Sequence, residues 1–135
     1  MEHVVVGIIY KVVNGEKLYL FMSSKKNFGE FTGLFYPVGG HLEFGEDEET
    51  ALKREVKEEL GIEAMPIEKI AESPGDVPNQ ITHWWKCKPL NFDINLVLRD
   101  DEYVREIKWL SKDQIKSNSD LLWPATYNFF SKYIF

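Results

Sequence analysis

The distribution of apolar and polar residues predicts extended segments on both sides of a central helix. Stretches rich in β-branched, aliphatic and aromatic residues indicate strands, with turn-forming residues between them. The strand candidates cover residues 3–13, 17–23, 64–72, 80–88, 93–98 and 104–110, with a short extended piece at 34–38. Asn14-Gly15-Glu16 separates the first two candidates and is typical of a hairpin, so we expect these two strands to pair.

One segment in the middle of the chain shows a helical pattern. Leu52, Val56 and Leu60 recur every four residues and form an apolar stripe. The acidic residues at its start suit the positive end of a helix, and Gly61 suits the position just after a helix. The pattern therefore predicts a helix over residues 47–60.

Two further helices are predicted near the carboxyl terminus. One begins at Ser111, and the other begins near Pro124 and runs towards Tyr133. Segments 24–33 and 73–79 are rich in turn-forming and polar residues and are expected to be loops. Because strands precede and follow one helix instead of alternating with helices, the order indicates a mixed α+β fold.

Length and composition fit a single small domain. With 135 residues, 44% of them apolar, the chain can form a continuous core, and we expect one domain over residues 1–135. The formal charge of −6 argues against nucleic acid as a partner. The lone Cys87 excludes an internal disulfide, and the apolar run 4–9 is too short to span a bilayer. We therefore expect a cytoplasmic protein without a membrane segment.

The predicted central helix has an acidic face. Glu55, Glu58 and Glu59 fall at i, i+3 and i+4, so their carboxylates lie side by side. Such a face repels itself unless cations bind to it. Carboxylates favour Mg²⁺ or Mn²⁺ over zinc, and the histidines and the cysteine lack zinc-site spacing. We expect Arg54 to pair with Glu46, because a planar guanidinium can hold a carboxylate at two points.

The segment from Gly40 to Ile62 matches a known motif at every specified position. Its residues Gly40, Glu46, Arg54-Glu55-Val56, Glu58-Glu59 and Gly61-Ile62 stand at the spacing G-x5-E-x7-R-E-U-x-E-E-x-G-U, where U is aliphatic. Ordinary residue frequencies give a chance match on the order of 10⁻⁷ or less. The segment resembles the Nudix box, and the chain is similar to MutT-like Nudix hydrolases.

This resemblance implies both a fold and an activity. The fold would be a Nudix α/β/α sandwich, with a mixed sheet beside a loop-helix-loop motif. The activity would be hydrolysis of a nucleoside diphosphate linked to another moiety. Glu55, Glu58 and Glu59, with the carbonyl of Gly40, would hold Mg²⁺ or Mn²⁺. Arg54 and Glu46 would complete the catalytic motif.

The general base and the substrate contacts are less closely defined. The resemblance implies that the base is either a box glutamate or a later carboxylate, and the candidates for the second kind are Asp100, Asp101, Glu102 and Glu106. The substrate-binding candidates are Tyr36, His41, Trp84, Asp101 and Glu102, with Phe35, Trp85 and Trp109 as further aromatic candidates. A ring stacked on a base contributes roughly 1–3 kcal/mol, and core packing is the alternative for each ring. We expect Trp123 to anchor the last helix.

Several substrates fit the resemblance. A nucleoside triphosphate, normal or oxidised, is the first hypothesis because the chain is short. ADP-ribose, nucleotide sugars and dinucleoside polyphosphates are alternatives, and the acidic balance counts against capped RNA. A nucleotide-sensing module without hydrolysis is an alternative from another class. Homodimerisation is a further hypothesis, whose candidate contacts are Trp84, Phe129, Phe130 and Phe135.

Overall fold

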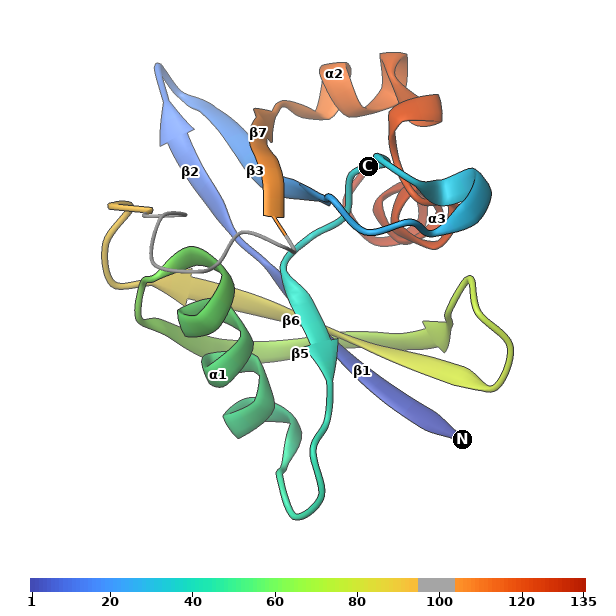
Figure 1. The fold of residues 1–135 in the computed structure, drawn as a ribbon. Coiled ribbons are helices and arrows are strands. Elements are labelled where there is room, and N and C mark those ends of the chain that lie inside the picture. The colour runs from blue at the N-terminus through green and yellow to red at the C-terminus, as the bar shows by residue number, and fades with distance from the viewer. Residues whose placement is uncertain (95–103) are drawn as a thin grey trace.

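The structure is a computed structural model, and it describes residues 1–94 and 104–135. Its strands are β1 (Glu2–Ile8), β2 (Tyr10–Val13), β3 (Glu16–Ser24), β4 (Gly39–His41), β5 (Ala64–Pro74), β6 (Gln80–Pro89) and β7 (Val104–Leu110). Its helices are α1 (Glu48–Leu60), α2 (Lys112–Ser117) and α3 (Pro124–Tyr133), with short 3-10 turns at Gly29–Phe31 and Ser119–Leu121. The order is that of a mixed α+β fold, as predicted (Figure 1).

The described strands form two sheets. The four-stranded sheet has the order β4-β1-β6-β5 and is mixed, because β1 runs parallel to β6 and its other neighbouring strands are antiparallel. The three-stranded sheet has the order β2-β3-β7 and is antiparallel. Residues of both sheets pack with α1 in one core and with α3 in another.

The sequence predicts that segment 3–13 pairs with segment 17–23. Only the second half of segment 3–13 does so. β2 and β3 form the hairpin around Asn14 and Gly15, whereas β1 joins the other sheet between β4 and β6. The run Val4-Val5-Val6-Gly7-Ile8-Ile9 explains the difference, because a strand covered on both faces is apolar throughout and does not alternate. Strand β2 follows directly, lies in the smaller sheet and ends in two exposed residues.

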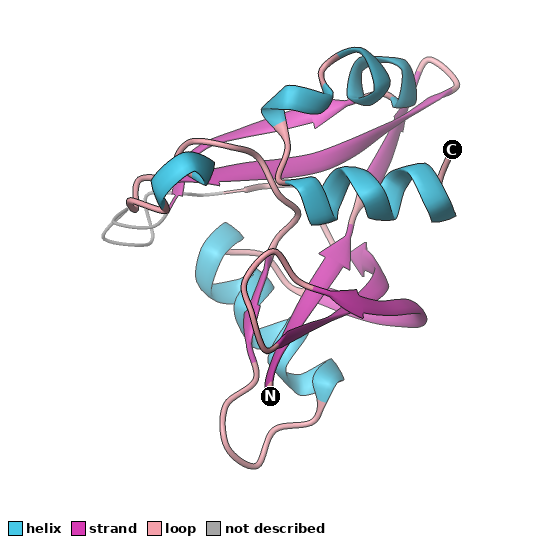
Figure 2. Cartoon of the chain, turned by 90° about the vertical axis from the view of Figure 1, so that its right-hand side faces the viewer, coloured by secondary structure: helices cyan, strands magenta, loops and turns pink. Residues whose placement is uncertain are grey.

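Helices cover both faces of the four-stranded sheet (Figure 2). Val5 packs in one core with the apolar stripe of α1, and its neighbour Val6 packs in a second core with Phe129 and Phe130 of α3. Successive residues of a strand point to opposite faces, so β1 contributes to both cores. The arrangement is the predicted α/β/α sandwich.

Helix α1 has the predicted ends. The side chain of Asp47 accepts a hydrogen bond from the backbone N–H of Thr50 at 2.8 Å, and Gly61 closes the helix with a φ of 70°. Leu52, Val56 and Leu60 are fully buried. Burial of each such side chain contributes roughly 1.5–3 kcal/mol, so the apolar stripe holds α1 on the sheet.

The remaining predictions agree with the described elements, with two exceptions. In the extended piece expected at 34–38 only Phe35 and Tyr36 form isolated bridges, and strand β4 begins after it, at Gly39. Strand β5 continues two residues beyond its predicted end, and Ser111 caps α2 as expected. For the strand candidate at 93–98, Asp93 and Ile94 form no strand, and its other residues lie outside the described residues. Asp100, Asp101 and Glu102 lie outside them as well.

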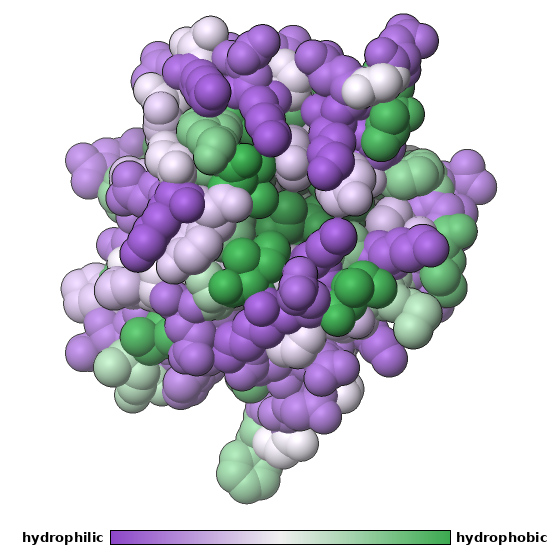
Figure 3. All heavy atoms as spheres, turned by 180° about the vertical axis from the view of Figure 1, so that it is seen from behind, coloured by the Kyte–Doolittle hydropathy of each residue, from purple (hydrophilic) through white to green (hydrophobic). Residues whose placement is uncertain are grey.

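The face opposite to the viewer of Figure 1 is mainly hydrophilic. Apolar surface gathers in a hollow in the middle of this face, with polar side chains around it (Figure 3). Among the helices of the described residues, none is long and apolar enough to cross a bilayer.

Candidate functional site

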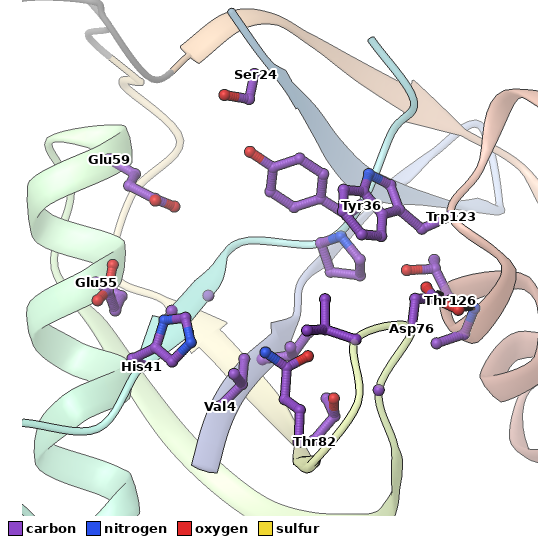
Figure 4. Close-up of a pocket in the computed structure, with 18 of the residues that line it drawn as sticks. Val4, Ser24, Tyr36, His41, Glu55, Glu59, Asp76, Thr82, Trp123 and Thr126 are labelled. Atoms are coloured by element: carbon purple, nitrogen blue, oxygen red, sulfur yellow. Dashed lines mark hydrogen bonds between the residues drawn. The ribbon is translucent and has the colours of Figure 1, made fainter. Parts of the chain in front are cut away.

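A cleft of about 580 Å³ lies between α1, β4, the turn after β5 and the start of α3. Glu55, Glu58 and Glu59 lie on the α1 side of this cleft. Asp76 and Trp123 lie at its opposite end (Figure 4). The cleft therefore joins an acidic end, formed by one helix, to an end formed by several elements.

At the acidic end, Gly40 and Glu55 are in close contact. A Cβ atom at position 40 would clash with the Glu55 carboxylate, so any residue larger than glycine would displace this carboxylate from its position. Strand β4 is thus brought against α1, and the main chain of Gly40 lies beside the carboxylate. Glu58 and Glu59 line the same cleft, so the four residues predicted as metal ligands border one cleft.

Arg54 ties the loop before α1 to the helix. Its Nε and Nη2 atoms donate to the two oxygens of Glu46 at 2.8 and 2.9 Å, which is the predicted two-point pairing. Nη2 also donates to the carbonyl of His41 at 3.1 Å. Nη1 donates to Glu55 at 2.9 Å and to Glu58 at 3.3 Å. One guanidinium therefore fixes the loop and contacts two carboxylates of the acidic face.

The comparisons with known proteins agree with this geometry. The NUDIX domain model matches residues 1–133. The chain belongs to the Nudix family. A NUDIX hydrolase structure from Nitrosomonas europaea has a TM-score of 0.78 at 19% identity, covering 96% of this chain and 86% of that one. A MutT NUDIX hydrolase structure from Burkholderia pseudomallei has a TM-score of 0.77 at 20% identity, covering 99% and 98%.

A curated Nudix relative is much longer than this chain. The human NAD-capped RNA hydrolase NUDT12 is 23% identical over 108 residues, which is 80% of this chain and 22% of that protein. The chain thus spans about a fifth of the length of this relative. At these identities the solved structures show the fold, and the family match confirms the predicted membership of the Nudix hydrolases.

The electrostatics of the Nudix box favour a bound cation. Burial raises the pKa of Glu55, Arg54 opposes this shift, and the neighbouring Glu58 adds to it. Arg54, by its hydrogen bonds, is the main cause that lowers the pKa of Glu46 to about 2. Burial and the charge of Glu59 raise the pKa of Tyr36 well above its usual value. The ionised form of the partly buried Glu55 is therefore disfavoured, and a cation beside it would stabilise that form.

Nudix hydrolases generally use divalent cations, and the box residues fit such an ion. The donors are carboxylate oxygens next to the main chain of Gly40, the ligand type that Mg²⁺ and Mn²⁺ prefer. Among the described residues, no three His, Cys, Asp or Glu side chains already converge as a metal site. Arg54 contacts Glu55 and Glu58 instead, so a metal ion would compete with its guanidinium for these carboxylates.

The predicted substrate contacts near the Nudix box differ in their surroundings. Tyr36 and His41 both line the cleft. His41 is exposed, with Nε2 at 3.4 Å from a Glu2 oxygen. Asp101 and Glu102 lie outside the described residues, as does Asp100.

Trp84 belongs mainly to the second core. It is 2% exposed, its ring stacks on Phe129 at 4.2 Å, and its Nε1 donates to the Ser73 hydroxyl at 2.8 Å. Phe129 and Phe130 are also buried, so three of the four proposed dimer contacts lie in the core. Core packing, the alternative considered for these rings, is what the structure shows, and Phe135 is the partly exposed member.

The aromatic end of the cleft contains Trp123 and Asp76, which the sequence analysis did not predict as substrate contacts. Trp123 packs against Phe31, Phe28 and Tyr36, with ring centroids at 4.8, 5.3 and 6.1 Å. It also precedes α3, as expected of an anchor for that helix. Both oxygens of Asp76 accept a hydrogen bond from the Ala125 N–H at 3.1 Å. The turn-rich segment 73–79 gave no signal that it reaches α3.

Proposed function

We propose that the chain is a divalent-metal-dependent Nudix hydrolase that cleaves a nucleoside diphosphate linked to another moiety. Within this class, a nucleoside triphosphate, normal or oxidised, is the first candidate substrate. The observation that carries the proposal is the acidic face of α1, which opens into a cleft with an aromatic opposite end. Residues 1–135 would act as one cytoplasmic domain.

In this proposal, Glu55, Glu58, Glu59 and the Gly40 carbonyl hold the metal. A bound Mg²⁺ or Mn²⁺ supplies charge neutralisation and lowers the pKa of a bound water. Arg54 keeps the loop and the helix together through its contacts with Glu46 and the His41 carbonyl.

Two further side chains of the cleft suit a phosphate chain. Lys26 lines the cleft and carries a positive charge that suits phosphate oxygens. The phenol of Tyr36 is protonated at neutral pH, as in any tyrosine, and burial raises its pKa further, so it can donate a hydrogen bond to a phosphate oxygen. Lys26 and Tyr36 would orient the phosphates and would not act as the general base.

The aromatic end supports a nucleobase as the other part of the substrate. Trp123 lines the cleft, while Trp84 has one ring face covered by Phe129. We therefore assign the stacking role to Trp123 rather than Trp84. A stacked base contributes roughly 1–3 kcal/mol to binding, which is enough to hold the nucleoside away from the acidic end.

A second candidate substrate class contains two linked nucleotides. The human relative is named as an NAD-capped RNA hydrolase, which favours a dinucleotide or a capped RNA end. The formal charge of −6 counts against a long RNA. A nucleotide-sensing module without hydrolysis is less well supported, because every specified residue of the Nudix box is present.

Product analysis would test the proposal. The purified protein is incubated with Mg²⁺ or Mn²⁺ and with nucleoside triphosphates, 8-oxo-dGTP, ADP-ribose, nucleotide sugars, dinucleoside polyphosphates or NAD. Metal-dependent cleavage of one class, absent in Glu58→Gln, would establish hydrolysis and its substrate class. Metal-dependent binding of a nucleotide without cleavage of any compound would overturn hydrolysis and support the sensing module.

A further inference from the structure

A polar cluster lies under the first turn of α1, outside the specified positions of the Nudix box. Its members are Glu48 of α1, Lys69 of β5, and His83 and Trp85 of β6, which we call the Glu48 cluster. Glu48 is the second of the seven positions that the motif leaves unspecified between Glu46 and Arg54. None of its four residues holds the metal or orients the phosphates in the proposed mechanism.

Glu48 binds both strands of the β5-β6 pair. Its Oε1 accepts a hydrogen bond from Trp85 Nε1 at 2.9 Å and lies 3.0 Å from Lys69 Nζ. Its Oε2 accepts a second contact from Lys69 at 3.1 Å. The Glu48 side chain is only 26% exposed, so these contacts are partly shielded from water. The first turn of α1 is thus fastened to the sheet by charged hydrogen bonds.

His83 is the remaining member of the Glu48 cluster. Its Nδ1 lies 2.9 Å from Lys69 Nζ, and its Nε2 lies 2.8 Å from His3 Nδ1. Because an ammonium group has only donors, His83 Nδ1 accepts, so the ring is neutral and its Nε2–H donates to His3. The carboxylates of Glu48 and Glu72 lie 3.4 and 3.5 Å from His83 Nδ1. The groups facing His83 therefore come from α1, β1 and β5.

The helical geometry links this cluster to the metal site. Glu48 and Glu55 are seven residues apart, which at about 100° per residue is within about 20° of two full turns. Both glutamates thus lie on one face of α1. Glu48 contacts β5 and β6, while Glu55 lies against Gly40 of β4, at the opposite edge of the same sheet. Rotation of α1 about its axis would move both carboxylates.

We propose that Glu48 is a positioning residue of this Nudix hydrolase. By binding Lys69 and Trp85, it sets the rotation of α1 on the sheet and so holds Glu55 beside Gly40. This inference rests on the proposed function, since it takes Glu55 to be a metal ligand. The apolar stripe of α1 keeps the helix on the sheet, and Glu48 fixes which residues face β4.

The test compares Glu48→Ala with Glu49→Ala, its matched control. Glu49 lies in the same turn, carries the same charge and is exposed. The binding of Mn²⁺ is measured from the electron paramagnetic resonance signal of free Mn²⁺, and backbone hydrogen exchange is measured over α1. Loss of a group that holds a metal ligand in place typically costs 10–100-fold in affinity, so we expect weakening of about tenfold in Glu48→Ala. Glu49→Ala should change it by less than about twofold.

Two further variants separate positioning from general stability. Trp85→Phe removes the N–H donor to Glu48 and keeps an aromatic ring, although a smaller one, against the first core, so it should weaken Mn²⁺ binding less than Glu48→Ala and leave the protein folded. Ser111→Ala removes the cap of α2, far from the metal site, and should lower the unfolding temperature without affecting Mn²⁺ binding. Hydrogen exchange near Glu55 should increase in Glu48→Ala and stay unchanged in Glu49→Ala.

The outcomes are distinct. Equal Mn²⁺ affinity in Glu48→Ala and Glu49→Ala, with only a lower unfolding temperature in the former, would overturn the positioning role. A wild-type protein that binds Mn²⁺ without hydrolysing any substrate would overturn the proposed function alone. If the wild type did not bind Mn²⁺, both the metal assignment and this inference would be overturned.

Discussion

The two ends of the cleft are held by different forces. At the acidic end, hydrogen bonds of 2.8 to 3.3 Å from Arg54 fix carboxylates of a single helix and of the loop before it. At the aromatic end, Trp123 packs against rings from the loop after β3. The first arrangement concentrates charge and suits an ion. The second presents flat apolar surface and suits a base.

This difference separates the chemistry from the selectivity. Changes at the acidic end should affect turnover with every substrate, because each one would present phosphates to the same proposed metal site. Changes at the aromatic end should affect affinity in a way that depends on the base. The experiments below use this contrast, starting with the largest expected effect.

Glu58→Gln should have the largest effect. The substitution removes one charge from the proposed metal site, so turnover should fall by orders of magnitude at saturating Mg²⁺. The Glu58 side chain is 41% exposed, so the protein should stay folded. Steady-state hydrolysis and circular dichroism melting would measure the two effects. Glu49→Gln is the matched control, and near-normal turnover in Glu58→Gln would show that Glu58 is no metal ligand.

Arg54→Lys should have the next largest effect. A lysine keeps the charge but cannot hold both oxygens of Glu46 and the His41 carbonyl at once. Activity should fall about 10–100-fold, as is typical when a group that orients metal ligands is lost. Turnover at increasing Mg²⁺ would be compared with that of Lys53→Arg, an exposed basic residue of the same helix. Equal loss in both variants would contradict the orienting role of Arg54.

The acidic end is also the part that local sequence predicts. The ends of α1 at Asp47 and Gly61, and the pairing of Arg54 with Glu46, depend on residues close in the chain and on helical periodicity. The motif spacing then identified the family. Each of these features depends on residues that are close together in the chain, so the sequence alone predicts it.

The aromatic end depends on long-range pairing, which the sequence does not state. Trp123 enters the cleft because its backbone N–H donates to the carbonyl of Phe35, and Asp76 enters it because the turn after β5 reaches α3. Nothing local in β1 shows that its neighbours are β4 and β6. For the same reason, the pattern did not decide whether Trp84 packs in the core or faces a ligand.

Trp123→Ala tests the aromatic end, with Trp84→Ala for comparison. Loss of a stacking ring should weaken nucleotide binding by about 1–3 kcal/mol in Trp123→Ala. Trp84→Ala should lower the free energy of unfolding by about 3–5 kcal/mol and leave affinity unchanged, since Trp84 is a core residue. Titration calorimetry and urea unfolding would measure these effects. The reverse pattern would move the stacking role to Trp84.

The pH dependence of stability should show the smallest effect. Burial lowers the pKa of His83 below its usual 6.5, with the charges of Lys69 and His3 adding to this and those of Glu48 and Glu72 opposing it. As the pH falls, His83 therefore takes up a proton in the unfolded chain before it does so in the folded protein. Neutral His83 makes its full contribution to stability above pH 6.5. This contribution is lost as the pH falls through the pKa that His83 has in the folded protein.

His83→Gln isolates this contribution. Glutamine can accept a hydrogen bond from Lys69 and donate one to His3, but it does not titrate. Urea unfolding at pH 7.5, 6.5 and 5.5 should show a steeper loss of stability in the wild type than in His83→Gln. The carboxylate of Glu46, with its pKa of about 2, loses its contribution only below pH 4.5 and does not interfere. Equal pH slopes would mean that His83 has the same pKa in both states, and that its neutral form does not support the first turn of α1.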